Sequence, residues 1–252
     1  MFGKDKDVNK RKIHVRKSFI GGCLYIGLFV YLAFAQSPLD NRIGCKMDGY
    51  VKMMYPLMYS VAMLLPLIWN VFVYFRNDFS ILQITRKGSW NTLFWEQEQK
   101  CFLFSILYAV VLLGWISIVN GTLPFFNWNQ IQSYYFLENN HTALYSSLET
   151  FVYIFIICVI RNLISHNILL FFLWKKNSLL YGTLFLCGIS CFEIAQYRIR
   201  ILYRLFSVEY TMWPYMIYKI KMVLGFVIWL DIAILLFFRA IHCKELIGNG
   251  KV

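Results

Sequence analysis

Six apolar stretches recur along this chain, and they limit its fold more than any other feature. They lie at residues 19–35, 53–75, 101–119, 146–174, 179–195 and 222–238. A helix needs about 20 mostly apolar residues to cross the hydrocarbon core of a bilayer, and these stretches approach or exceed that length. The sequence therefore predicts an all-α, polytopic membrane protein with six transmembrane helices in a single domain, residues 1–252.

The composition supports a membrane protein over a soluble one. Hydrophobic residues make up 59% of the chain and charged residues only 15%, against about 25% charged residues in typical soluble domains. The first apolar stretch is longer than the core of a signal peptide and has no convincing cleavage site. We therefore expect it to be retained as the first span.

The distribution of Lys and Arg predicts the orientation. With the N-terminus in the cytoplasm, sixteen of these residues fall in cytoplasmic segments and eight in outer segments. Cytoplasmic loops of membrane proteins carry such an excess. We expect a multi-pass protein of the cell membrane with both termini cytoplasmic, and the net charge of +12 is attributed to topology rather than to nucleic-acid binding.

No catalytic or cofactor motif was found. The sequence lacks a GxxxxGK[ST] phosphate loop, an HExxH or GxSxG pattern and paired Cys/His metal spacing. We therefore expect no enzyme activity, no metal site and no cofactor bound by this chain itself.

Polar residues inside the apolar stretches are the remaining candidates, because intramembrane charges are costly and often functional. Four stand out: Glu149, Arg161, His166 and Asp231. We expect structural polar contacts at helix ends or between subunits, with Arg161 within reach of the cytoplasmic surface or paired with Asp231. An intramembrane enzyme using these groups is the alternative. Glu193 is expected at the outer interface.

The last outer segment, residues 196–221, carries five Lys and Arg, more than the charge rule favours. Apolar residues alternate with basic ones there, so Leu202 and Tyr203 can share a face while Arg198 and Arg200 turn away. This pattern predicts two short helices lying in the outer interface. The alternative is an extension of the fifth span whose basic side chains reach back to the surface.

The most informative segment is the predicted cytoplasmic link at residues 76–100. Apolar residues predict a short surface helix, a basic turn with glycine follows, and an amphipathic helix then leads into the third span. The residues expected to carry this segment's function are Phe79, Ile81, Leu82, Arg86, Lys87, Gly88 and Trp90. Together they predict a compact cytoplasmic knob, and a loop resting on the membrane is the alternative.

The chain resembles a small permease subunit of the type-2 ABC exporters. The resemblance rests on the basic stretch at residues 10–17, on six spans in about 250 residues, and on aromatic, partly amphipathic sequence between the last two spans. It rests also on the sequence Ile-Leu-Gln-Ile-Thr-Arg-Lys-Gly-Ser-Trp at 81–90, which is similar to the coupling helix of that family.

The resemblance implies partners and a mechanism. A second permease subunit, identical or related, would share the bilayer with this chain. A separate ATPase subunit would bind ATP and Mg²⁺ and receive the link segment in a groove. The cargo would be hydrophobic or amphipathic, such as a peptide or lipid, and small members of the family serve in antimicrobial-peptide export or immunity.

Two further functions remain open at this point. An ATP-independent immunity or scaffold protein would sequester its ligand without a partner ATPase. A secondary transporter would depend on a proton or sodium gradient.

Overall fold

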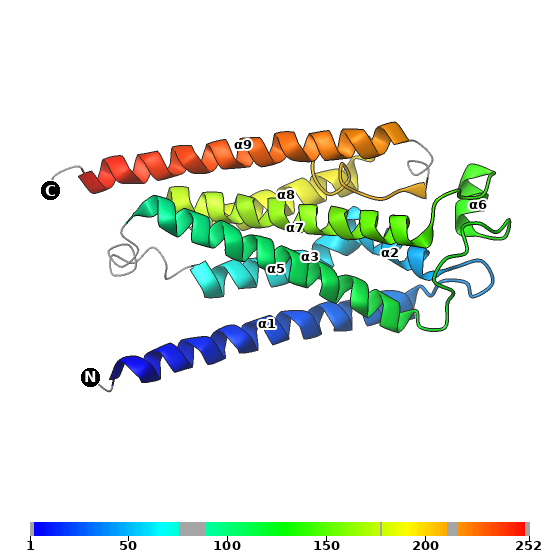
Figure 1. Cartoon of the computed structure of the whole chain (residues 1–252), viewed down its shortest axis with the longest axis horizontal. Helices are drawn as coiled ribbons and strands as arrows, with labels where there is room; N and C mark the ends of the chain where they lie inside the picture. Colours follow the sequence, from blue (N-terminus) through cyan, green and yellow to red (C-terminus); the bar gives the residue numbers. More distant parts are fainter. Residues whose placement is uncertain (1–2, 76–88, 177, 211–215, 250–252) are drawn as a thin grey trace.

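The computed structural model describes residues 3–75, 89–176, 178–210 and 216–249, and all regular structure in those ranges is helical. Six long helices run roughly along the long axis of the molecule (Figure 1). They are α1 (Gly3–Gln36), α3 (Pro56–Phe75), α5 (Trp90–Val119), α7 (Ser147–Lys176), α8 (Leu179–Ala195) and α9 (Met216–Asn249). Two short helices, α2 (Lys46–Met54) and α6 (Tyr134–Asn139), complete the described part, which confirms the all-helical prediction there.

Each predicted apolar stretch coincides largely with one of the long helices. Four of these helices are long and apolar enough to cross a membrane: α1 over Lys17–Gln36, α3, α5 and α7. Helix α8 is apolar but shorter, with 17 residues. A helix satisfies its backbone hydrogen bonds internally, which is why apolar stretches of this length are stable in lipid only as helices or closed barrels. The protein is therefore a membrane-embedded helical bundle.

The long helices alternate in direction, so the two chain termini lie at the same end of the bundle (Figure 1). We call this the terminal end; α3 ends there and α5 begins there. The opposite end, which we call the loop end, carries α2, α6 and residues 196–210.

Helix α7 is the central element of the bundle. It contacts α2, α3, α5, α8 and α9, and residues 161–170 are all buried. The fourth apolar stretch thus forms one continuous helix, and other helices pack against it on several sides. Helices α1 and α9 instead present large apolar side chains outward, including Leu24 and Leu235, which are 62% and 67% exposed.

Helices α1 and α5 approach each other closely at Gly27. A Cβ atom added at Gly27 would collide with the indole of Trp115. Glycine is required here by the close approach of the two helices rather than by its backbone angles.

The second predicted stretch, residues 53–75, is divided in the structure. Helix α2 ends at Met54, Tyr55 adopts an extended conformation with φ −60° and ψ 140°, and Pro56 begins α3. Proline lacks an amide hydrogen and disfavours a helical conformation in the residue before it. It therefore separates two helices where one interrupted span was expected.

The first of the two short helices predicted for the outer segment is not formed. Residues 196–210 make turns instead, and the second predicted helix lies partly outside the described residues. The expected division of side chains is nevertheless found, because Leu202 and Tyr203 are buried while Arg198 and Arg200 are exposed.

Candidate functional site

Most of the predicted coupling residues lie outside the described ranges: Phe79, Ile81, Leu82, Arg86, Lys87 and Gly88. Trp90 is the first residue of α5, and Ser89 caps that helix by accepting a hydrogen bond from Thr92 N at 3.1 Å. The Trp90 ring is half-buried and packs edge-on against Trp174 of α7, with centroids 5.6 Å apart. One side of Trp90 is therefore engaged within the bundle.

Arg161 is one of the fully buried charged groups of the described bundle. Its side chain is 0% exposed, and its guanidinium donates to the carbonyl oxygens of Met54 at 2.7 Å and Tyr203 at 2.6 Å. The guanidinium also lies over the ring of Tyr59, 3.9 Å from its centroid. Arg161 thus joins α7, the end of α2 and the turns after α8. It is buried within the bundle, whereas the sequence led us to expect it within reach of a membrane surface.

A polar network continues from Arg161 along α7 to the terminal side. The Tyr59 hydroxyl donates to Asn162 Oδ1 at 2.5 Å, and Asn162 Nδ2 donates to the carbonyl of Ser105 at 3.2 Å. His166 Nδ1 lies 3.0 Å from Ser105 Oγ, while its buried Nε2 has no partner among the described residues. Ser105 is thus the side chain that hydrogen-bonds to His166 among the described residues, and the network joins α3, α5 and α7.

Glu193 holds the turns that follow α8. Its carboxylate accepts four backbone N–H bonds, from Ile201 and Leu202 at 2.6 Å each, from Tyr203 at 2.8 Å and from Arg204 at 3.2 Å. These amides would otherwise need helical or sheet partners. The carboxylate supplies them, which explains why the segment forms turns, and Glu193 is buried rather than interfacial.

Asp48 is a second buried carboxylate at the loop end. It accepts hydrogen bonds from the backbone N–H of Cys45, the indole N–H of Trp128 and the hydroxyl of Tyr210, each at 2.7 Å. Desolvation by burial raises the pKa of Asp48, and the hydrogen bonds from Tyr210 and Trp128 oppose that shift. Asp48 therefore ties α2 to the α5–α7 connection and to the turns after α8.

A pocket of about 560 Å³ opens at the loop end between α2, α6 and the turns at 197–210. Its lining includes four tyrosines and the charged residues Asp48, Lys52, Glu138 and Glu209. The volume lies within the range of small-molecule sites, about 300–1,000 Å³. We take this loop-end pocket as the candidate functional site.

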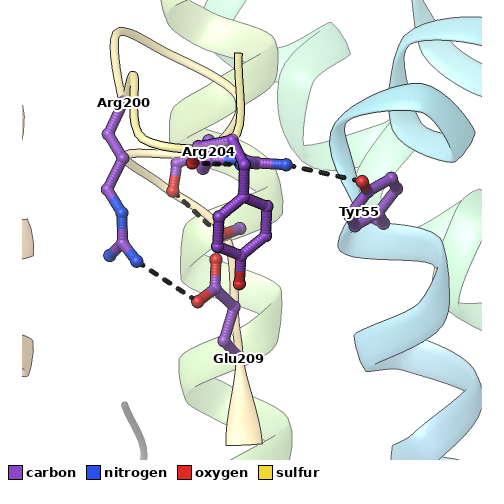
Figure 2. Close-up of polar contacts among 6 residues, drawn as sticks. Tyr55, Arg200, Arg204 and Glu209 are labelled. Atoms are coloured by element: carbon purple, nitrogen blue, oxygen red, sulfur yellow. Dashed lines mark hydrogen bonds and ion pairs between the residues drawn. The ribbon is translucent and has the colours of Figure 1, made fainter. Parts of the chain in front are cut away.

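Two residues that line the loop-end pocket, Tyr55 and Glu209, are contacted by arginines of the turns (Figure 2). Arg200 forms an ion pair with Glu209 at 3.4 Å. Arg204 donates to the carbonyl of Tyr197, lies 4.2 Å from the centroid of its ring and reaches across to the hydroxyl of Tyr55 at 3.4 Å. Figure 2 shows this reach from the turns to Tyr55 at the α2–α3 junction.

The remaining two predicted polar residues lie apart from this site. Glu149 is exposed in the first turn of α7, where its carboxylate accepts hydrogen bonds from the backbone N–H and hydroxyl of Ser146 at 3.0 Å each. Asp231 is exposed on α9. The structure therefore does not pair Asp231 with Arg161, whose two terminal guanidinium nitrogens each donate to a carbonyl oxygen.

Sequence analysis missed Asp48 and the pocket around it. The spacing of Cys45 and Asp48 is that of a capping box, in which the third helical residue reaches back to the N-cap amide. That local signal was present in the sequence. The distant donors Trp128 and Tyr210 carry no signal that would connect them to Asp48.

Comparison with protein-family models, with curated proteins and with solved structures found no match to this chain. The class of protein therefore rests on the fold and the site alone. They define a membrane-embedded α-helical bundle with a tyrosine- and carboxylate-lined pocket at one end.

Proposed function

We propose that this protein is a permease subunit of an ATP-binding-cassette transporter in the cytoplasmic membrane. Six helices would cross the bilayer with both termini in the cytoplasm, and the cargo would be a hydrophobic or amphipathic molecule such as a peptide or lipid. A separate ATPase subunit would bind ATP and Mg²⁺, and a second permease subunit would complete the pathway.

The observation that carries this proposal is the separation of the two ends of the bundle. The connection from α3 to α5, which contains the coupling-like sequence, starts and finishes at the terminal end. The pocket opens at the loop end. A transporter driven from the cytoplasm needs such a division, with the energy source at one end and a cargo site at the other.

The charge pattern gives this division an orientation. Seven Lys and Arg occur in residues 1–18, at the terminal end of α1. The positive-inside rule favours the cytoplasm for such a segment, so the terminal end would face the ATPase and the loop end the outside.

The mechanism requires two arrangements of the helices. ATP can drive transport only if the ATPase dimer binds the two arrangements with different affinity, since equal affinity shifts no equilibrium. Movement of the α3–α5 connection would be transmitted through α5 to α7, which contact each other.

Co-purification with a nucleotide-binding subunit tests the proposal. The expected result is that Arg86→Ala and Trp90→Ala each weaken the association, because both residues belong to the predicted coupling segment. The matched control is Trp95→Ala, since Trp95 lies one turn further along α5 and is half exposed. Association unchanged in both coupling variants would remove the coupling role.

Orientation is tested separately by labelling Lys87→Cys in intact cells, in a background where the native cysteines are replaced. The proposal requires protection from an impermeant reagent outside the cell and labelling after permeabilisation. Full labelling from outside would place the segment away from ATP and would contradict the proposal.

One observation favours a second function, an ATP-independent immunity protein that holds its ligand. The centre of the bundle is filled by the buried residues 161–170 of α7, and the loop-end pocket offers a place to hold a ligand without moving it through the bundle. Protection of cells that lack any partner ATPase would favour this second function over transport.

A further inference from the structure

We propose that the loop-end pocket binds the ammonium head of an amphipathic organic cation. This inference rests on the proposed function, because it specifies the chemistry of the cargo at the outer site. The contacts that each charged side chain of the pocket lining already makes decide which charge a ligand can carry.

The one lysine of the pocket lining is occupied by the protein itself. Lys52 Nζ donates to the carbonyl oxygens of Ala33, at 3.3 Å, and Ser37, and it lies 4.6 Å from the ring centroid of Phe34. These carbonyls belong to the last turn of α1 and the residue following it, where a cation is favoured. Lys52 therefore closes α1 and is poorly placed to neutralise an anionic ligand.

The carboxylates leave negative charge in the pocket. Asp48 is committed to three donors of the fold, as described above. Glu209 shares its charge with Arg200 at the long distance of 3.4 Å and with the hydroxyl of Ser207 at 3.2 Å. Glu138 of α6 is exposed, and no hydrogen bond or ion pair joins it to another described residue. Glu138 and Glu209 are therefore the groups available to a cationic ligand.

The aromatic lining favours the same charge. The rings of Tyr55, Tyr134, Tyr197 and Tyr210 line the pocket, and the faces of aromatic rings attract cations. Two of these rings already hold a cation of the protein, since the Arg204 guanidinium lies 4.2 Å from the centroid of Tyr197 and 5.8 Å from that of Tyr55. Arg204 occupies these two rings, so Tyr134 and Tyr210 are the tyrosines of the lining that can face a bound ammonium group.

An apolar tail has a place beside the charged head. Leu39, Val51 and Met58 also line the pocket, and the pocket lies at the end of helices whose outer surfaces are apolar. A ligand with an ammonium head and an apolar tail would satisfy both parts at once. Lysine side chains of amphipathic peptides and small alkylamines share this chemistry.

The test measures binding to the full chain in nanodiscs of uncharged lipid, without any ATPase. The probes are hexylammonium, hexanol and hexanoate, each titrated against empty nanodiscs as a blank. Hexylammonium is expected to bind about tenfold more tightly than hexanol, a difference of about 1.4 kcal/mol. Its affinity should fall as salt is raised, because the carboxylates are partly exposed.

The variant Glu138→Gln combined with Glu209→Gln should reduce hexylammonium binding to the level of hexanol while leaving hexanol binding unchanged. Asp40→Asn is the matched control, because Asp40 is an exposed carboxylate at the same end that does not line the pocket. Tighter binding of hexanoate than of hexylammonium, or wild-type affinity in the double variant, would overturn the inference.

A second arm distinguishes the two sources of the ammonium group. The affinity of an amphipathic peptide with one lysine is compared with that of its Nε-acetylated form. If this affinity ratio exceeds the ratio between hexylammonium and hexanol, the head group is assigned to a peptide. Equal affinities of the charged and the acetylated peptide would assign the ammonium group to a small amine. Because no ATPase is present, failure here leaves the coupling experiment intact, and failure of the coupling experiment leaves this binding result intact.

Discussion

The two ends of the bundle are stabilised in different ways. Towards the loop end, the buried charged side chains of Arg161 and Glu193 bond mainly to backbone groups. The buried Asp48 accepts from one backbone N–H and from the side chains of Trp128 and Tyr210. At the terminal end, aromatic pairs are prominent among the described contacts, as between Trp90 and Trp174 and between Phe94 and Phe237.

The difference follows from the regularity of the backbone. Long helices satisfy their own amides and carbonyls, so the terminal halves of α5, α7 and α9 need only apolar packing between them. The turns at the loop end leave backbone groups without helical partners, and a buried group left unsatisfied costs about 1–3 kcal/mol. Charged side chains therefore stabilise the loop end by replacing missing backbone partners.

The largest expected effect is that of Arg161→Met. Methionine keeps an apolar stem of similar length but leaves the carbonyls of Met54 and Tyr203 without their donor. We expect a loss of about 3 kcal/mol in the free energy of unfolding, measured by denaturation in mixed micelles. The control Arg200→Met removes only a partly exposed ion pair and should cost less than about 1 kcal/mol; an equal cost in both variants would remove the special role of Arg161.

Glu193→Gln should have a smaller effect, about 2 kcal/mol, because the amide keeps one acceptor oxygen and turns an NH₂ group towards the remaining donors. The damage should be local. Hydrogen exchange is expected to become faster at residues 201–204 and to stay unchanged in the centre of α7. Uniform acceleration throughout the bundle would show instead that Glu193 supports the whole fold.

At the terminal end, Trp174→Phe should cost about 1 kcal/mol. The substitution keeps an aromatic ring against Trp90 and Phe94 but removes the indole N–H that donates to Gln97 Oε1 at 2.7 Å. Thermal unfolding in detergent measures the change. Trp95→Phe is the control, and it should leave the stability nearly unchanged because Trp95 is half exposed. A cost above that of Glu193→Gln would contradict the division between a polar and an aromatic end.

The smallest effect is expected for Asp231→Asn on the exposed face of α9. Its carboxylate makes no contact with Arg161, so the free energy of unfolding of the isolated chain should change by no more than about 0.5 kcal/mol. A double-mutant cycle with Arg161→Met should be additive. A coupling above 1 kcal/mol would revive the pairing that the sequence suggested.

The course of the helices was accessible from the sequence, whereas most of the site was not. Length and apolarity predict helices directly, and α8 was placed at residues 179–195 as observed. Arg161 was recognised as a costly intramembrane charge, but its partners are two carbonyl groups, and every residue has one. Only the fold shows which carbonyls lack helical donors.

In the turns after α8, the sequence predicted the burial of side chains but not the conformation of the backbone. The alternation of apolar and basic residues correctly separated buried from exposed side chains. It could not predict the backbone conformation, because that depends on a carboxylate eight to eleven residues earlier.

The length of the fourth apolar stretch had no explanation in the sequence. In the structure this stretch is α7, and other helices pack against it on several sides.

The interruption of the chain at Tyr55 links a proline on one helix to an arginine on another. Met54 is the last residue of α2, so its carbonyl is among those that have no amide donor in their own helix. Arg161 supplies that donor from α7. Proline at 56 thus creates one of the two carbonyl acceptors that Arg161 serves, and fusing α2 with α3 would leave Arg161 with the carbonyl of Tyr203 as its remaining backbone partner.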